Sequence, residues 1–220
     1  MLNIFDIIGP IMTGPSSSHT AGAVRLGRLA AAILGAEVSE ASMEMHGSFA
    51  STGQGHGTRQ ALVAGLMGWK DDDRRIPESF AYASQAGLAF EFIMTDLGES
   101  AHPNSVRFRL VGKNGETLTT TGCSIGGGRV RIVEVNGISV DIAGELPTLL
   151  TFHYDRAGVV AGITRVLAEH GINVATMSVY RKRKGEIAVM VVGTDQPAEE
   201  AELQTIEQFD HVIAVRNLSS

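Results

Sequence analysis

The hydrophobic positions in the first third of the chain repeat with the period of an α-helix. Residues 21–35 place apolar side chains on a broad helical face and end at a glycine, which is typical of helix C-termini. Residues 60–67 and 80–88 show the same period, so the pattern predicts three helices. Residues 43–45 alternate apolar and polar side chains ahead of Phe49 and indicate a strand.

The pattern changes to a period of two after Phe90. Apolar and polar residues alternate over 105–110 and again over 130–132, which predicts strands. Asn114-Gly115 and Asn136-Gly137 are turn signals that favour hairpins. Helices and antiparallel strands in mixed order predict an α+β domain rather than a doubly wound parallel sheet.

The last third of the chain predicts a second, smaller domain. Its expected strands are residues 149–153, 173–179, 186–192 and 212–215, and its expected helices are residues 157–169 and 198–208. This order, βαββαβ, is the ferredoxin-like plan. Residues 143–147, Ala-Gly-Glu-Leu-Pro, are the most convincing linker, so we place one domain at 1–146 and the other at 147–220.

Composition and charge narrow the function classes. A chain of 220 residues, 44% of them hydrophobic, can bury two small cores. Its apolar stretches are far shorter than the ~20 residues that a membrane-spanning helix needs, and a net charge of −6 argues against nucleic acid as a partner. Residues 1–6 lack the basic start of a secretory signal, so we expect a cytoplasmic protein without a membrane partner.

Three local patterns limit the chemistry further. Cys123 is the only cysteine, so this chain cannot build an iron–sulfur site from its own thiolates, and we expect no metal ligands on it. Residues 122–126 fit the hydrolase pattern Gly-x-Ser-x-Gly, but a strand rather than a helix follows, which favours a glycine-rich turn or bulge. The glycine loop at 53–57 matches neither the dinucleotide fingerprint nor the Walker loop.

Two loops place polar side chains just before predicted helices. The first contains Ser16, Ser17, Ser18, His19 and Thr20, and hydroxyls beside unpaired backbone N–H groups suit a carboxylate. An N-cap in a Gly-Pro turn explains the same residues equally well. The second loop contains His56, and a histidine can act as general acid or base near neutral pH.

A third polar loop joins the first strand and first helix of the C-terminal domain. His153, Asp155 and Gly158 lie in it, where a helix N-terminus can bind a small zwitterion. Alternatively, Asp155 caps the helix and Gly158 only allows close packing. The basic run at 181–184 is followed by a glycine and has apolar runs on both sides, so it predicts a solvated hairpin end.

These motifs together resemble a known family. Its members are β subunits of bacterial iron–sulfur-dependent L-serine dehydratase (L-serine deaminase), and the likeness runs nearly end to end. The motifs that carry it are Gly9-Pro10, Gly14-Pro15-Ser16-Ser17-Ser18-His19-Thr20-Ala21-Gly22, Gly55-His56-Gly57-Thr58, His102-Pro103-Asn104 and Ser124-Ile125-Gly126-Gly127-Gly128. In that family the N-terminal part resembles the allosteric-substrate-binding domain of some phosphoglycerate dehydrogenases. The C-terminal part resembles an ACT domain, a regulatory module of amino-acid enzymes.

The resemblance implies the conversion of L-serine to pyruvate and ammonia, a step of amino-acid catabolism and gluconeogenesis. It implies a 4Fe-4S cluster that acts as a Lewis acid on the substrate hydroxyl. With one cysteine here, the cluster is expected on an α subunit, whose active site this chain completes. The catalytic residues implied are Ser16, Ser17, Ser18, His19, Thr20 and His56, with the serines holding the substrate carboxylate and a histidine assisting proton transfer.

For the ACT domain the resemblance implies an amino-acid effector and self-association. The effector contacts expected on this pattern are His153, Asp155, Gly158 and Asn173, and Asp155 stands where serine-binding relatives often have asparagine. A different class of protein fits the same sequence: a non-catalytic amino-acid-binding regulator whose N-terminal loop senses a carboxylate. A cysteine-rich partner encoded next to this chain would favour the enzyme subunit. A pyridoxal phosphate enzyme is disfavoured, because no lysine lies in a plausible cofactor loop.

Overall fold

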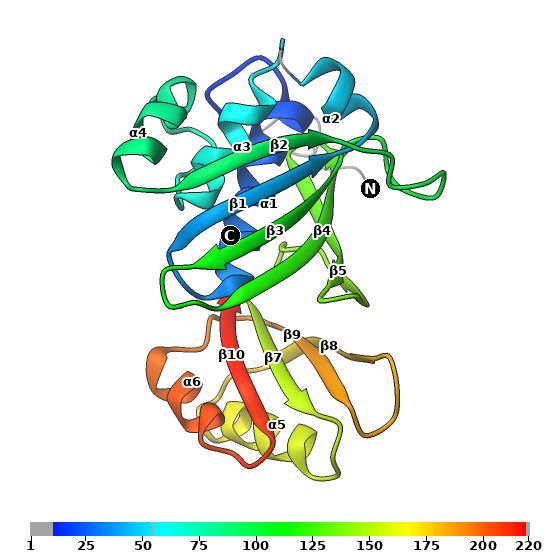
Figure 1. The fold of residues 1–220 in the computed structure, drawn as a ribbon. Helices are drawn as coiled ribbons and strands as arrows, with labels where there is room; N and C mark the ends of the chain where they lie inside the picture. Colours follow the sequence, from blue (N-terminus) through cyan, green and yellow to red (C-terminus); the bar gives the residue numbers. More distant parts are fainter. Residues whose placement is uncertain (1–10, 54, 219–220) are drawn as a thin grey trace, which may run out of the picture. The chain divides into compact units, whose positions relative to one another are not determined.

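The computed structural model describes residues 11–53 and 55–218. The N-terminal residues 1–6 and the Gly9-Pro10 motif lie outside this part. The chain divides into two compact units, residues 1–137 and 138–220 (Figure 1). Within the described residues, no helix combines the length and apolar character needed to cross a bilayer.

A mixed sheet organises the first unit. Its strand order is β2-β1-β3-β4-β5-β6. Strand β2 runs parallel to β1, whereas β1 with β3, β3 with β4 and β4 with β5 are antiparallel. This arrangement confirms the predicted α+β class. The strands are β1 Val38–Met45, β2 Ala89–Met94, β3 Ser105–Gly112, β4 Thr117–Gly126, β5 Arg129–Val135 and β6 Ile138–Ile142.

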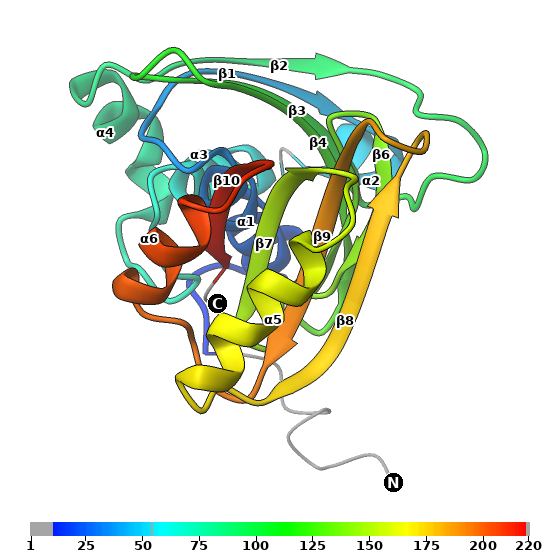
Figure 2. The same cartoon turned by 90° about the horizontal axis from the view of Figure 1, so that it is seen from below.

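Helices cover one face of this sheet, where β1 to β3 curve over α1 and α3 (Figure 2). The helical elements are η2 Ser17–Ala21, α1 Gly22–Leu34, α2 Gly47–Thr52, α3 Thr58–Leu66, η3 Ile76–Glu78 and α4 Ser79–Gln85. The three predicted helices match α1, α3 and α4. Three helical elements were not predicted: α2, which has only six residues and no side-chain cap; the π-helical turn η2, which continues directly into α1; and the three-residue η3.

Glycines set the separation of α1 and α3. A Cβ atom added to Gly27 would come within 2.4 Å of the Leu62 carbonyl oxygen, and one added to Gly65 within 2.1 Å of the Val24 carbonyl oxygen. Both distances are far below van der Waals contact, so the two backbones touch where they cross. The segments just before the two helices are also joined, because the Thr20 hydroxyl donates to the His56 carbonyl at 3.0 Å.

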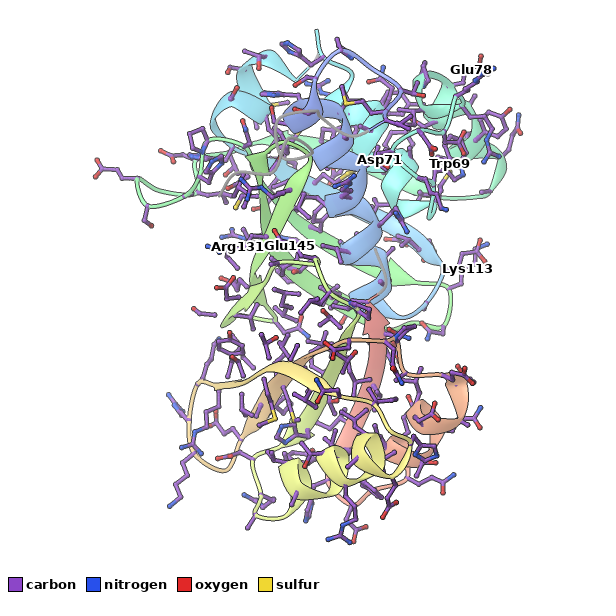
Figure 3. All side chains as sticks on the ribbon, turned by 180° about the vertical axis from the view of Figure 1, so that it is seen from behind. Trp69, Asp71, Glu78, Lys113, Arg131 and Glu145 are labelled. Carbon is purple, nitrogen blue, oxygen red and sulfur yellow. The ribbon has the colours of Figure 1, made fainter. Side chains whose placement is uncertain are left out.

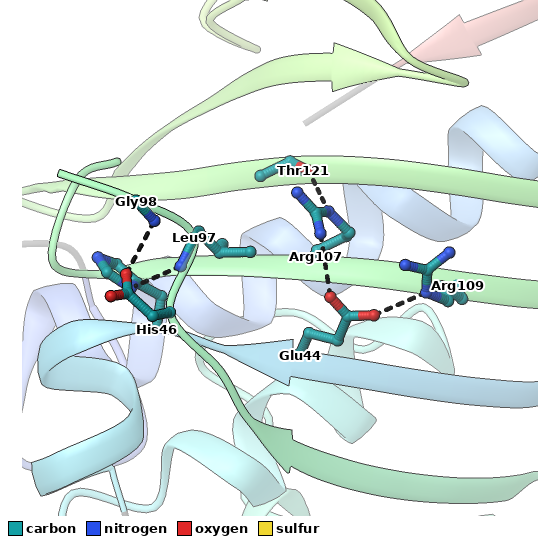
Figure 4. A network of polar contacts seen from close by, with 8 residues as sticks. Glu44, His46, Leu97, Gly98, Arg107, Arg109 and Thr121 are labelled. Atoms are coloured by element: carbon teal, nitrogen blue, oxygen red, sulfur yellow. Dashed lines mark hydrogen bonds and ion pairs between the residues drawn. The ribbon is translucent and has the colours of Figure 1, made fainter. Parts of the chain in front are cut away.

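The opposite face of the sheet carries a charged network (Figure 4). Glu44 on β1, whose side chain is 13% exposed, accepts hydrogen bonds from Arg107 at 3.1 Å and Arg109 at 2.7 Å. Burial alone would raise the pKa of Glu44, but hydrogen bonds and charge from Arg109 and Arg107 outweigh burial and lower it. The carboxylate therefore stays ionised well below neutral pH.

We expect Glu44→Gln to lower the free energy of unfolding at pH 7 by about 1–2 kcal/mol, because charge-assisted bonds to partly exposed arginines are lost. A folded-state pKa below the ordinary 4.5 adds stability above that pH and loses it as the pH falls through the folded value. The difference from the native chain should therefore shrink in acid. Urea unfolding at pH 7 and pH 3.5 checks this, with Glu40→Gln, exposed on the same strand, as the control. An equal loss at both pH values would contradict it.

The second unit has the predicted ferredoxin-like topology. Its elements are β7 Thr148–Tyr154, α5 Val159–Glu169, β8 Val174–Arg181, β9 Ile187–Thr194, α6 Glu200–Glu207 and β10 Val212–Leu218. The strand order is β10-β7-β9-β8 with antiparallel neighbours. The two helices bury one core with the sheet, which includes Leu149, Ile163, Leu167, Met190 and Ile206. Strand β8 is an edge strand, and its side chains are mostly exposed.

The predicted domain boundary at 146/147 stays a prediction. Strand β6 is the last strand of the six-stranded sheet, yet it is grouped with the second compact unit, which begins at Ile138. The predicted linker, residues 143–147, is irregular and joins β6 to β7.

Candidate functional site

Four of the motifs singled out in the sequence, at residues 14–20, 55–58, 102–104 and 124–128, lie together in the first unit. The Pro103 carbonyl accepts hydrogen bonds from the amides of Ser48 at 2.8 Å and Phe49 at 3.4 Å, where α2 begins. The Asn104 carbonyl accepts one from the Ser124 amide at 3.0 Å. The turn at 102–104 therefore supports its neighbours through its backbone and connects the α2 turn to the glycine-rich end of β4.

The serine-rich turn is both a helix cap and a cluster of hydroxyls. Ser16 is the N-cap, and its Oγ accepts a hydrogen bond from the His19 amide at 3.1 Å, which confirms the capping interpretation for this residue. Ser18 Oγ lies 3.2 Å from His19 Nδ1. Thr20 is buried, and its hydroxyl donates to the His56 carbonyl at 3.0 Å. Thr20 thus ties the two predicted loops together, and its hydroxyl does not face open space.

The structure brings His19 and His56 together. Their ring centroids are 5.0 Å apart, and the buried Phe49 packs edge-on against His19 at 5.3 Å. Burial, followed by the nearby charge of His56, lowers the pKa of His19, while a hydrogen bond with the Ser48 backbone opposes them. His19 is therefore neutral at physiological pH, the state in which a ring nitrogen can accept a proton.

The tautomer of neutral His56 follows from one contact. Its Nδ1 lies 3.0 Å from the Thr52 carbonyl oxygen. Because a carbonyl can only accept, Nδ1 carries the proton of that bond. In the neutral ring, Nε2 then holds the lone pair. His56 can accept a proton only at Nε2 while this contact persists.

Sequence reasoning missed two hydroxyl residues of α2. Ser48 Oγ lies 3.0 Å and Thr52 Oγ1 3.2 Å from His19 Nε2. Both belong to the unpredicted six-residue helix between β1 and the glycine loop at 53–57. In the sequence, Ser48 and Thr52 stand out only by position: they lie between the predicted strand at 43–45 and the glycine loop that contains His56.

The Gly-x-Ser-x-Gly segment is structural, as predicted. Ser124 is fully buried within β4, and a Cβ atom on Gly22 would come within 2.2 Å of its Oγ. Gly126, Gly127 and Gly128 all have positive φ, so this segment turns into β5 and builds no nucleophile elbow.

An arginine of α1 anchors that glycine turn. Arg25 donates to the Gly128 carbonyl at 3.0 Å and pairs with Asp71 at 2.6 Å. Figure 3 shows Asp71 beside α1, in the segment that follows α3. The ion pair and the carbonyl contact fix the glycine turn against the helix that starts at the serine-rich cap.

The residues present do not fit an iron–sulfur cluster. Over 11–53 and 55–218, no three histidine, cysteine, aspartate or glutamate side chains come together in a group that could hold a metal ion. The single cysteine, Cys123, is buried within β4. A cluster with several thiolate ligands has no place among these residues.

In the second unit, Asp155 is engaged by the β8–β9 hairpin. Its carboxylate accepts a hydrogen bond from the Gly185 amide at 2.9 Å and pairs with Arg181. The Gly185 amide, followed by Arg181, lowers the pKa of Asp155. The N-cap of α5 is Gly158, which makes no side-chain cap bond, so the alternative that Asp155 caps this helix is wrong. The basic run at 181–184 is exposed at the turn between β8 and β9, which confirms the predicted solvated hairpin end, and Arg181 pairs with Asp155.

The four predicted effector contacts do not converge within one chain. His153 is buried with Nδ1 2.9 Å from the Tyr154 carbonyl, and Asn173 donates to Asp195 at 2.8 Å. Asn173 follows the C-terminus of α5 and Gly158 precedes its N-terminus, so the 11-residue helix separates them by about 16 Å. A cavity of about 510 Å³ flanks the start of α5, and Gly158 is the one predicted contact residue that lines it.

Comparisons with known proteins match both units. Residues 3–134 match the family model described as serine dehydratase beta chain, and residues 148–211 match the ACT domain model. The chain is 40% identical over 217 residues to the "Probable L-serine dehydratase, beta chain" of Bacillus subtilis, covering 99% of this chain and 98% of that one. It is 40% identical over 197 residues to the "L-serine dehydratase, beta chain" of Peptoniphilus asaccharolyticus, covering 90% and 89%. A "D-3-phosphoglycerate dehydrogenase" of Bacillus subtilis shares 25% identity over 87% of this chain and 36% of its own length.

Proposed function

Because the chain belongs to the serine dehydratase beta chain family and carries an ACT domain, we propose that it is the β subunit of an L-serine ammonia-lyase. With an α subunit it converts L-serine to pyruvate and ammonia in the cytoplasm. One observation of the structure carries the proposal: a serine-rich helix cap and two histidines form one cluster in the first unit.

The chemistry of the reaction divides between the two subunits. Loss of the α-proton needs a base, and loss of the β-hydroxyl needs a Lewis acid or a proton donor. The 4Fe-4S cluster on the α subunit supplies the Lewis acid. This chain supplies His56 Nε2 and the neutral His19 for proton transfer, and the hydroxyls of the 16–18 cap beside backbone N–H groups for the substrate carboxylate.

Co-expression tests this proposal against the regulator alternative. The chain is produced anaerobically together with a cysteine-rich α subunit, sought in the adjacent reading frames, and pyruvate formed from L-serine is measured. Each chain assayed alone is the control. Pyruvate formation by the complex only is the expected result. A complex without lyase activity, from a chain that still binds an amino acid by calorimetry, would favour the non-catalytic regulator.

We also propose that the ACT domain binds an amino-acid effector through a paired copy. Gly158 and Asn173 lie at opposite ends of α5, so a second chain is needed to bring such positions to one ligand. Strand β8 is an exposed edge with Met177 and Val179 on its surface, and unpaired edges are ready sites for strand addition. Strand β8 is therefore the surface through which we expect two ACT domains to pair.

The full chain is therefore expected to be a dimer in light scattering. The double variant Met177→Lys and Val179→Lys should be a monomer, because charges on an edge strand oppose pairing. Ile213→Lys is the matched control, since Ile213 is an exposed apolar residue on the other edge strand, β10. A monomeric native chain, alone and in the complex, would contradict the proposal.

A further inference from the structure

Thr52, the last residue of α2, contacts both histidines of the site. Its hydroxyl oxygen lies 3.2 Å from His19 Nε2, and its carbonyl oxygen lies 3.0 Å from His56 Nδ1. The same residue therefore reaches one histidine through its side chain and the other through its backbone. The two contacts can be separated experimentally, because a substitution removes the hydroxyl and leaves the carbonyl.

The direction of the Thr52 hydroxyl is fixed by a backbone acceptor. Thr52 Oγ1 donates to the Ser48 carbonyl at 2.9 Å, and a carbonyl cannot donate in return. A hydroxyl has one hydrogen. Toward its other neighbours, Ser48 Oγ at 3.1 Å and His19 Nε2 at 3.2 Å, Thr52 can therefore only accept.

His19 Nε2 is then either protonated or unprotonated, and the two states can be compared. In the first, the Ser48 hydroxyl donates to Thr52, and His19 Nε2–H donates to the Ser48 and Thr52 oxygens, so that every contact contains a hydrogen. In the second, His19 Nε2 is unprotonated, and the single Ser48 hydrogen goes either to His19 or to Thr52. In both cases two of the three contacts among Ser48, Thr52 and His19 place lone pair against lone pair. The first arrangement is favoured because it leaves no such contact.

Protonation at Nε2 leaves the lone pair of neutral His19 on Nδ1. Ser18 Oγ lies 3.2 Å from Nδ1 and donates to it. The Ser18 hydrogen is thereby used within the cluster, so in the 3.4 Å contact between Ser16 Oγ and Ser18 Oγ the donor is Ser16. The lowered pKa of His19 keeps this neutral form populated.

We infer that Thr52 is a positioning residue that sets opposite tautomers in the two histidines. Its hydroxyl holds His19 in the Nε2–H form, and its carbonyl holds His56 in the Nδ1–H form. The two proton-accepting nitrogens are then His19 Nδ1, beside Ser18, and His56 Nε2. The tautomers themselves do not depend on the reaction, and only their use in catalysis rests on the proposed function.

The direct test is ¹⁵N NMR of the histidine rings in the full chain, at a pH where both are neutral. The native chain is expected to show His19 protonated at Nε2 and His56 at Nδ1. Thr52→Val frees the Ser48 hydroxyl to donate to His19, so the His19 population should shift toward Nδ1–H while His56 is unchanged. Thr52→Ser should restore the native pattern. Native His19 protonated at Nδ1, or an identical spectrum for Thr52→Val, would overturn the inference.

Kinetics of the assembled complex separate this inference from the proposed function. Thr52→Val is expected to lower kcat about 10-fold with a smaller change in KM, because a wrong tautomer removes a proton acceptor. Thr52→Ser should recover most of the loss, and Ser51→Ala, exposed on the same helix, serves as the folding control. A shifted tautomer with unchanged kcat would refute the positioning role in catalysis. A native complex without lyase activity would refute the proposed function, while the NMR result still decides the tautomers.

Discussion

His56→Gln and His19→Gln are each expected to lower the turnover of the assembled complex by about 10²–10⁴-fold, since a positioned general acid or base contributes a factor of this size. The two rings lie 5.0 Å apart at one end of the first unit, and each carries one unprotonated nitrogen when neutral. Steady-state pyruvate formation with full KM and kcat curves measures the effect. His170→Gln, at the end of α5 in the other unit, is the control.

Near-normal turnover in both histidine variants would show that this cluster takes no part in catalysis. A loss confined to one of them would identify the residue that takes the α-proton. Bound serine in the inactive variant would show that the proposed contacts between the cap and the substrate carboxylate form without the histidine.

The pKa of His19 gives this prediction a pH dependence. Because burial and His56 lower the pKa of His19, the neutral form should persist below pH 6.5, and activity that depends on it should fall only at lower pH. His56→Gln removes one of the two causes, so the pKa of His19 should rise, while burial still holds it below the ordinary value. An NMR titration of the full chain measures it, and an unchanged or lower pKa would contradict the assigned cause.

Gly65→Ala is expected to lower the free energy of unfolding of the first unit by about 3 kcal/mol, near the upper end of overpacking costs. The new methyl group would lie 2.1 Å from the Val24 carbonyl oxygen and 2.9 Å from the Arg28 amide, and neither atom belongs to a side chain that can rotate away. The α1 and α3 backbones must separate instead. Because the serine-rich cap starts α1 and His56 precedes α3, the complex should also lose activity.

Urea denaturation measures this change, and Gly55→Ala is the matched control. The nearest atom to a Cβ on Gly55 is the Thr52 carbonyl oxygen at 3.8 Å, an ordinary contact. Its stability should therefore stay within about 0.5 kcal/mol of the native chain. A Gly65→Ala chain as stable as the control would show that the helices can move apart without loss.

The helices and strands that could be predicted from the sequence are those whose own residues repeat apolar and polar side chains with a clear period. Residues 21–35 and 105–110 carry a clear period of their own, and the structure has α1 and β3 there. Helix α2 has no such signal. It forms because the Pro103 carbonyl, more than 50 residues away, accepts the Ser48 and Phe49 amides. A six-residue helix that depends on a distant turn cannot be read from its own residues.

The candidate site shows the same limit. The histidines were found from their loops, but Ser48 and Thr52 were not, because their roles depend on where α2 places them against His19. Asp155 is the converse case in the second unit. Its sequence position suggested a helix cap, yet the β8–β9 hairpin brings Arg181 and Gly185 to its carboxylate.

The bond between Thr20 and the His56 carbonyl also bears on how this site can diverge. Surface loops normally accept insertions easily, because little else depends on their length. Here the 14–20 loop runs directly into a helix, and the 53–57 loop lies between α2 and α3. The Thr20–His56 bond joins the two loops, and helices α1 and α3 touch through Gly27 and Gly65. We expect relatives to keep the lengths of 14–20 and 53–57 while the segment at 95–101 varies. Relatives that retain the histidine pair should then be recognised by the unchanged lengths of these two loops more than by the identity of the loop residues.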